Sequence, residues 1–129
     1  MEGILRDRRI LPTGQRLAVA RVTLAEPRHM TAEQVHVAVQ DSGDTASLAT
    51  VYNTLKLFTE RGLLREVIVE PGRVFYDSET RPHHHFYDVD SGKITDIPAS
   101  QLALLALPEP PAGKAIADVQ VIVRIGDAD

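Results

Sequence analysis

The strongest constraint on the fold comes from the segment between Ser47 and Gly62. Ser47 is a typical helix N-cap residue, and Gly62 is typical of the position just after a helix. Between them, four apolar residues recur at i, i+3, i+7 and i+10, which places them on one face of an α-helix: Leu48, Val51, Leu55 and Phe58. The sequence therefore predicts an amphipathic helix. Its other face is polar and carries Thr50, Tyr52, Asn53, Thr54 and Lys56.

Two shorter helices are expected before this one. Residues 13–25 follow Pro12 and place apolar side chains at spacings of three and four. Thr31 is followed three residues later by Gln34, which is the spacing of a capping box, and an apolar stripe follows. We expect this second helix to end before the turn that begins at Asp41.

Residues 63–70 and 73–77 are rich in β-branched and aromatic side chains, and Pro71 and Gly72 separate them. This pattern predicts a β-hairpin. Three short helices followed by a hairpin is the order of a winged helix-turn-helix, in which the last helix enters the DNA major groove and the hairpin touches the flank.

A second module follows. Residues 86–89 and 93–97 predict another hairpin, Pro98 begins a possible short helix, and the β-branched residues 118–125 predict a strand. We therefore predict an α+β protein, with an N-terminal winged helix-turn-helix DNA-binding domain in residues 1–80 and a small α/β dimerisation and sensing domain in residues 81–129. A homodimer would cover the apolar sheet and place two reading helices on a palindromic site in double-stranded DNA.

The net charge of −4 argues against DNA binding, but the charge is distributed unevenly along the chain. Residues 1–28 hold six arginines against three acidic residues, so a basic front end remains compatible with DNA. The absence of cysteine excludes disulfides, thiolate metal sites and cysteine nucleophiles. No run of about 18 apolar residues is present, and we expect a cytoplasmic protein without a membrane segment.

Two stretches, "SLATVYNTLKLFTERGLLREV" and "HHHFYDVDSGKITDI", resemble the ferric uptake regulator (Fur) family of metal-responsive transcription factors. The likeness extends over nearly the whole chain. Within that family, Asn53, the "HHHFY" run and the C-terminal "EPPAGKAIADVQVIVRI" are most similar to the iron response regulator (Irr) branch. The resemblance implies a dimeric transcriptional regulator of iron and haem genes, as repressor or as activator, that binds an iron-control type of palindrome, and a protein that is not an enzyme.

The same resemblance implies a regulatory metal site formed by His29, Asp77, His85 and Asp96. Two imidazoles and two carboxylates suit Fe2+, Mn2+ or Zn2+. From spacing alone, an ordinary loop histidine and ordinary turn acids are the alternative. The chain also departs from the family, because the CxxC zinc clamp that many relatives carry after the histidines is replaced by residues 88–91, "DVDS".

The three consecutive histidines allow a second ligand. Strand periodicity sends His83 and His85 to one face and His84 to the other. Since an imidazole can be an axial ligand of haem iron, the likeness to the Irr branch makes His83, His84 and His85 candidate haem ligands. A solvated histidine cluster is the alternative reading.

For DNA, we expect Tyr52 to pack against a thymine methyl group, with Thr50 and Asn53 near base edges or phosphates. Asn53 carries no charge, so phosphate affinity would depend on basic side chains elsewhere. These candidates are Lys56, Arg8, Arg9 and Arg16, with the N-terminal segment as a possible arm in the minor groove.

Two other functions stay open. A metal-activated Fur or manganese type of repressor without haem sensing would share the fold and differ in its effector. A small metal-dependent hydrolase could use His83, His85 and either Asp88 or Asp96 to hold a water-activating metal. The chain has no nucleophile elbow, phosphate loop or HExxH motif, which disfavours the hydrolase.

Overall fold

The computed structural model describes residues 1–102 and 106–128, and the chain divides into two compact units, Met1–Thr80 and Arg81–Asp129. The first unit contains α1 Glu2–Asp7, α2 Gly14–Leu24, β1 His29–Met30, α3 Ala32–Asp41, α4 Leu48–Glu60, β2 Arg65–Glu70 and β3 Arg73–Asp77. The second contains β4 His83–Asp88, β5 Ile94–Pro98, the 3-10 helix η1 Ala99–Gln101 and β6 Ile122–Ile125. The predicted α+β class is confirmed. Within the described ranges, no helix is long and apolar enough to cross a bilayer.

Helix α4 forms where the sequence predicts it. The Ser47 side chain accepts the backbone N–H of Thr50 at 3.1 Å, and Gly62 follows the helix with a φ of +76°, which favours glycine. Val51, Leu55 and Phe58 are fully buried and form the apolar face. Thr54, which we expected on the polar face, is also buried. Its hydroxyl donates to the Thr50 carbonyl at 2.8 Å, so burial leaves that group hydrogen-bonded.

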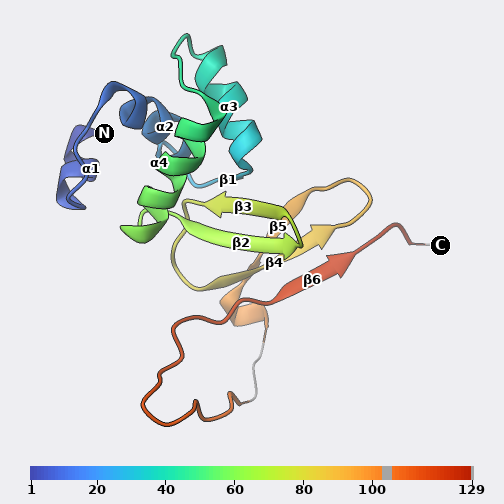
Figure 1. Cartoon of the computed structure of the whole chain (residues 1–129). Helices are drawn as coiled ribbons and strands as arrows, with labels where there is room; N and C mark the ends of the chain where they lie inside the picture. The colour runs from blue at the N-terminus through green and yellow to red at the C-terminus, as the bar shows by residue number, and fades with distance from the viewer. Residues whose placement is uncertain (103–105, 129) are drawn as a thin grey trace. The chain divides into compact units, whose positions relative to one another are not determined.

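Helices α2, α3 and α4 pack together around the core of the first unit (Figure 1). The capping box predicted at the start of α3 is present. Thr31 Oγ1 accepts the Gln34 N–H at 3.2 Å, and Gln34 Oε1 accepts the Thr31 N–H at 2.9 Å. These reciprocal bonds fix the first turn of α3 directly after the short strand β1.

The N-terminal segment is a helix and not the extended arm that we expected. Leu5 of α1 and Ile10 after it are buried in the core. The Arg8 guanidinium donates to the Arg61 carbonyl at 3.0 Å, and the Arg61 guanidinium donates to the carbonyls of Arg8 at 3.1 Å and Arg9 at 2.7 Å. This exchange holds α1 to the C-terminal end of α4. The segment is therefore not a free arm in this structure, and its contact with a minor groove stays a prediction.

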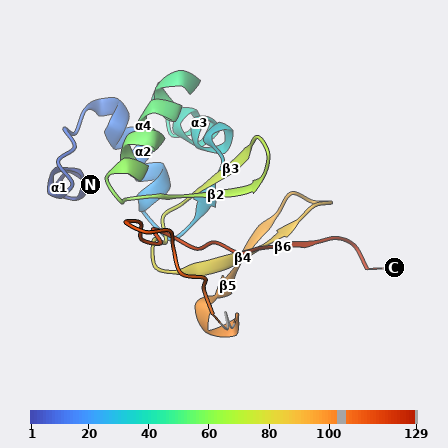
Figure 2. The same cartoon turned by 60° about the horizontal axis from the view of Figure 1, so that its bottom comes forward.

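The predicted hairpin after α4 is present, with Gly72 at φ +77° in its turn (Figure 2). It belongs to a three-stranded antiparallel sheet in the order β1-β3-β2. The two-residue strand β1 was not predicted, because two residues carry no periodicity. Its pairing places His29 directly opposite Asp77 and Met30 opposite Tyr76.

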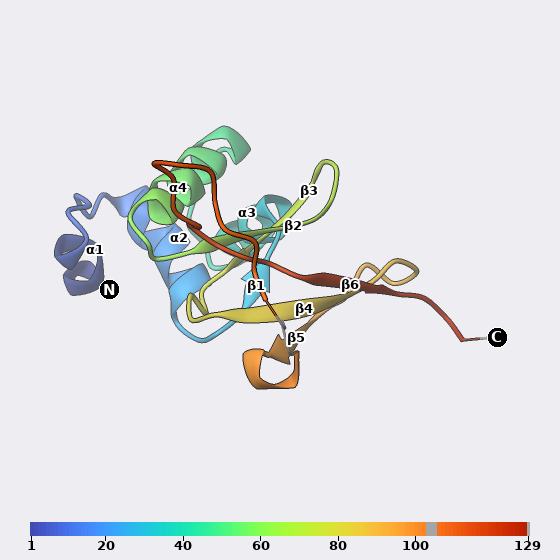
Figure 3. The same ribbon diagram turned by 90° about the horizontal axis from the view of Figure 1, so that it is seen from below.

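The second unit is a three-stranded sheet in the order β5-β4-β6, with β4 antiparallel to β5 and parallel to β6 (Figure 3). The hairpin expected around Ser91 and Gly92 is confirmed, and its first strand already begins at His83. The strand expected over residues 118–125 begins only at Ile122. Of the helix expected from Pro98, only the 3-10 helix η1 is present, and it ends at Gln101; residues 103–105 of the expected range lie outside the described residues.

Candidate metal centre and nucleic-acid surface

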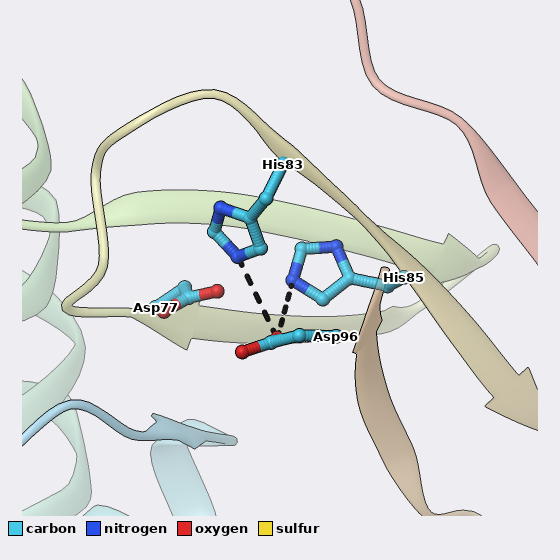
Figure 4. Close-up of side chains that lie close together, drawn as sticks. All are labelled: Asp77, His83, His85 and Asp96. Atoms are coloured by element: carbon cyan, nitrogen blue, oxygen red, sulfur yellow. Dashed lines mark ion pairs between the residues drawn. The ribbon is translucent and has the colours of Figure 1, made fainter. Parts of the chain in front are cut away.

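Two of the three consecutive histidines face Asp96 within the second unit, as Figure 4 shows. Asp96 is the direct partner of His85 in the β4–β5 register, so their side chains lie on the same face of the sheet, and His83 follows two residues away on that face. Asp96 Oδ1 lies 3.5 Å from His85 Nε2 and 3.6 Å from His83 Nε2. The predicted alternation of the histidines is therefore confirmed.

A hydrogen bond places a proton on one ring nitrogen of His83. Its Nδ1 lies 2.7 Å from the carbonyl oxygen of Arg81. Because a carbonyl can only accept, Nδ1 carries the proton and Nε2 of the neutral ring keeps its lone pair. A backbone carbonyl that holds one ring nitrogen while the other turns to the site is the usual arrangement of a metal-binding histidine.

His83, His85 and Asp96 form what we call the second-unit triad. Each offers one ligand atom within 4.8 Å of the others, and both histidines are buried while the Asp96 side chain is 53% exposed. Two imidazoles and one carboxylate suit Fe2+, Mn2+ or Zn2+. His83, which the sequence resemblance proposed only for haem, belongs to this donor set. The strand alternation carried that signal, since it already placed His83 on the face of His85.

His84 lies on the opposite face of β4, where its Nδ1 accepts the backbone N–H of Val121 at 3.1 Å. In the neutral ring this bond leaves the proton on Nε2, so His84 has its Nδ1 lone pair engaged in the fold. Asp88 is also committed elsewhere. Its Oδ1 accepts the N–H groups of Asp90 at 2.9 Å and Ser91 at 3.3 Å in the β4–β5 turn, and these bonds lower the pKa of its carboxyl group.

The first unit holds the other two predicted ligands, His29 and Asp77, which we call the first-unit pair. They are direct partners across β1 and β3, so their side chains share one face. The His29 ring packs edge-on against the Phe75 ring, with 6.3 Å between the ring centroids. Asp77 is buried, and its Oδ1 accepts the N–H of Glu79 at 2.9 Å.

Some of the predicted DNA-binding residues are brought together in the first unit. A hollow of about 320 Å³ lies between the start of α2 and the polar face of α4. It is lined by Thr13, Gln15, Arg16, Thr50, Asn53, Thr54 and Leu57. Arg16 also donates from its guanidinium to the Leu11 carbonyl at 3.0 Å. Lys56 is exposed on α4, whereas Arg8 and Arg9 lie beside Arg61 at the C-terminal end of that helix.

Tyr52 lines a different hollow, of about 660 Å³, together with the start of α3 and the β2–β3 turn. Its hydroxyl donates to Glu33 Oε1 at 2.8 Å. Glu33 was missed by sequence reasoning, because the partner lies 19 residues away and no local pattern marks it.

Comparison with known proteins identifies relatives that span both units. The sequence model of the Ferric uptake regulator family matches residues 9–109. The Peroxide-responsive repressor PerR of Staphylococcus aureus strain Mu50 is 32% identical over 98 residues, which are 76% of this chain and 66% of that relative.

Solved structures share the fold. The ferric uptake regulator from Pseudomonas aeruginosa with manganese superposes with a TM-score of 0.74 at 22% identity, over 99% of this chain and 98% of that chain. The Vibrio cholerae ferric uptake regulator gives a TM-score of 0.75 at 20% identity, over 98% of both chains.

Proposed function

Because this chain belongs to the ferric uptake regulator family, we propose that it is a dimeric, metal-responsive repressor that binds double-stranded DNA. The observation that carries the proposal is the second-unit triad, two buried imidazoles and a carboxylate aimed at one point in a chain whose other unit has winged helix-turn-helix order. Since the family consists of transcription regulators, we abandon the hydrolase alternative. Such a regulator would act in the cytoplasm, where the DNA is.

We extend the proposal to the first-unit pair. His29 and Asp77 offer one more imidazole and one more carboxylate on a shared sheet face. A cation held by donors from both units would fix the angle between the two units of each protomer. Metal binding would thereby set the orientation of the two reading helices of the dimer. When bound, the metal supplies charge and coordination geometry, and the protein supplies the donors.

The DNA surface we propose is the polar face of α4 with the start of α2. Tyr52, Thr50 and Asn53 would lie near base edges. Lys56, Arg16, Arg8 and Arg9 would serve the phosphates. Arg8 and Arg16 each use one guanidinium nitrogen for a backbone carbonyl and keep further N–H donors. The target would be a palindrome, because a twofold dimer presents two such helices.

The test is a binding titration on a duplex selected by the metal-loaded chain from a random pool, with its scrambled version as reference. Chelation should weaken binding to the selected duplex at least tenfold, and Asp96→Asn should behave like the chelated chain. Glu109→Gln, which removes an exposed carboxylate outside the triad, is the matched control. Equal affinity for selected and scrambled duplexes at about 150 mM salt would overturn the proposal.

A finer proposal concerns the effector. The sequence likeness to the Irr branch supports haem as a signal that weakens DNA binding, with His83, His84 or His85 as axial ligands. Because His83 and His85 also form the triad, haem and metal would compete for them. A haem titration followed in the Soret band, with and without Mn2+, tests this competition, and an unchanged spectrum leaves a plain metal sensor.

The similarity to the Peroxide-responsive repressor PerR favours a second candidate, in which peroxide releases the repressor from DNA. Hydrogen peroxide added to the chain loaded with Fe2+ should then weaken binding to the selected duplex, whereas the chain loaded with Mn2+ should keep it. Equal retention with both metals would remove this candidate.

A further inference from the structure

Tyr52 is the exposed aromatic side chain of α4, and its hydroxyl is already engaged. The side chain is 42% exposed, and the hydroxyl donates to Glu33 Oε1, in the first turn of α3, at 2.8 Å. Both residues border the hollow that continues to the β2–β3 turn. A single hydrogen bond thus ties the helix expected to read DNA to the helix before it.

The charge state of this pair is well defined. The hydrogen bond from Tyr52 is the largest cause that lowers the pKa of Glu33, and the nearby Arg73 lowers it further. The same bond is the largest cause that raises the pKa of Tyr52. At neutral pH, Glu33 is therefore an anion and Tyr52 a neutral donor, which makes this a charge-assisted hydrogen bond.

Building on the proposed DNA-binding function, we propose that Glu33 is a specificity-determining residue that makes Tyr52 read bases and not phosphates. A phenol has one O–H donor, and Glu33 accepts it. Phosphate oxygens only accept hydrogen bonds, so the held phenol has no donor for them. Its ring can still pack against a thymine methyl group, and its oxygen can still accept a hydrogen bond from the exocyclic amino group of adenine or cytosine.

The charge of Glu33 acts in the same direction. A carboxylate beside the reading surface repels the phosphate backbone and so disfavours binding that depends on phosphates alone. The same carboxylate can accept the cytosine amino group, which is a known base contact in the major groove. Glu33 should therefore lower affinity for random DNA and raise affinity for the correct site.

The experiment measures the affinities of the metal-loaded full chain for the selected and the scrambled duplex. Glu33→Ala should weaken binding to the selected duplex about 3- to 10-fold, the range of a partly exposed charged hydrogen bond. It should strengthen binding to the scrambled duplex about twofold, because one repulsive charge is lost. Asp41→Asn, which removes an exposed charge at the other end of α3, is the matched control and should leave the ratio of the two affinities unchanged.

Two further variants separate the hydrogen bond from the charge and from folding. Glu33→Gln keeps an acceptor for Tyr52 and loses the charge, so it should bind the scrambled duplex more tightly and keep most of the affinity for the selected one. Tyr52→Phe removes the donor, and in that background Glu33→Ala should no longer weaken binding to the selected duplex through the phenol.

The inference is overturned if the wild type discriminates between the duplexes while Glu33→Ala and Asp41→Asn have the same affinity ratio. A wild type that does not discriminate overturns the proposed function itself, so the two failures are distinguishable. A lower melting temperature with an unchanged ratio would assign Glu33 a structural role and also count against the inference.

Discussion

The backbone N–H of Val121 donates to Nδ1 of His84 at 3.1 Å, so the middle histidine of the triplet holds the chain that leads into β6. The next backbone bond of the same ladder runs from His85 N to Val121 O at 3.2 Å. The His84 side chain thus accepts the Val121 N–H, next to the backbone hydrogen bond between His85 and Val121. The triplet is therefore divided between two tasks, with His84 serving the fold and its neighbours facing Asp96.

This contact predicts the effect of His84→Leu. Leucine fills similar space but cannot accept, so the half-buried Val121 N–H loses its partner, and we expect a loss of about 1 kcal/mol in the free energy of unfolding. Hydrogen exchange at the Val121 amide should become faster. His84→Asn, whose side-chain oxygen can accept, is the matched control and should retain part of the protection. Unchanged exchange in His84→Leu would contradict the assignment.

Local signals were sufficient for the main elements of the first unit. The Ser47 cap, the apolar spacing of Val51, Leu55 and Phe58, and Gly62 are all local signals, so the bounds of α4 were predictable. The burial of two residues was not, because Leu48 is exposed and Thr54 is buried. The short elements α1 and β1 were missed, because they are stabilised by partners far along the chain. Leu5 is buried in a core built mainly by later residues, and β1 exists only through its pairing with β3.

The candidate metal centre was predictable in part, because the resemblance named His85 and Asp96, and the hydrolase alternative named His83 with them. Strand alternation placed His83 and His85 on one face, and the resemblance supplied Asp96. The role of His83 depends on its bond to the Arg81 carbonyl, and that of His84 depends on Val121, 37 residues away. Neither bond leaves a pattern in the sequence. The face of each histidine can therefore be predicted from strand alternation, whereas the hydrogen-bond partners of His83 and His84 are known only from the fold.

The second-unit triad predicts the effect of His83→Ala on metal affinity. Removing one of three converging donors should weaken Mn2+ binding by about tenfold or more, since even outer partners of metal ligands contribute about 10- to 100-fold. Isothermal titration of the purified chain with Mn2+ measures it. His36→Ala, which removes a histidine on α3 outside the triad, should bind Mn2+ like the wild type. Equal affinity of both variants would exclude His83 as a ligand.

The capping box predicts the effect of Thr31→Ala. The variant loses the acceptor for the Gln34 N–H at the start of α3, and we expect a loss of about 1 kcal/mol of stability, measured by urea denaturation. Thr31→Ser keeps the hydroxyl and should stay near the wild type. If both variants were equally destabilised, the contribution would come from the buried Thr31 methyl group and not from the cap.

Lys56 and Arg8 carry the same charge but lie in different surroundings. Removing Lys56 should therefore change the salt dependence of DNA binding, whereas removing Arg8 should also change stability. Lys56 is exposed on α4, and Lys56→Ala should reduce the salt slope of DNA binding by about one unit without changing the melting temperature.

Arg8→Ala removes the bond to the Arg61 carbonyl that joins α1 to α4. It should lower stability by about 0.5–1 kcal/mol and, because the proposed phosphate contact is lost with it, reduce the salt slope by about one unit. Arg6→Ala, which removes a charge from α1 itself, serves as the control for net charge. Lower stability with an unchanged salt slope in Arg8→Ala would instead leave its guanidinium only the bond to Arg61, because a structural bond alone does not change the number of phosphate contacts.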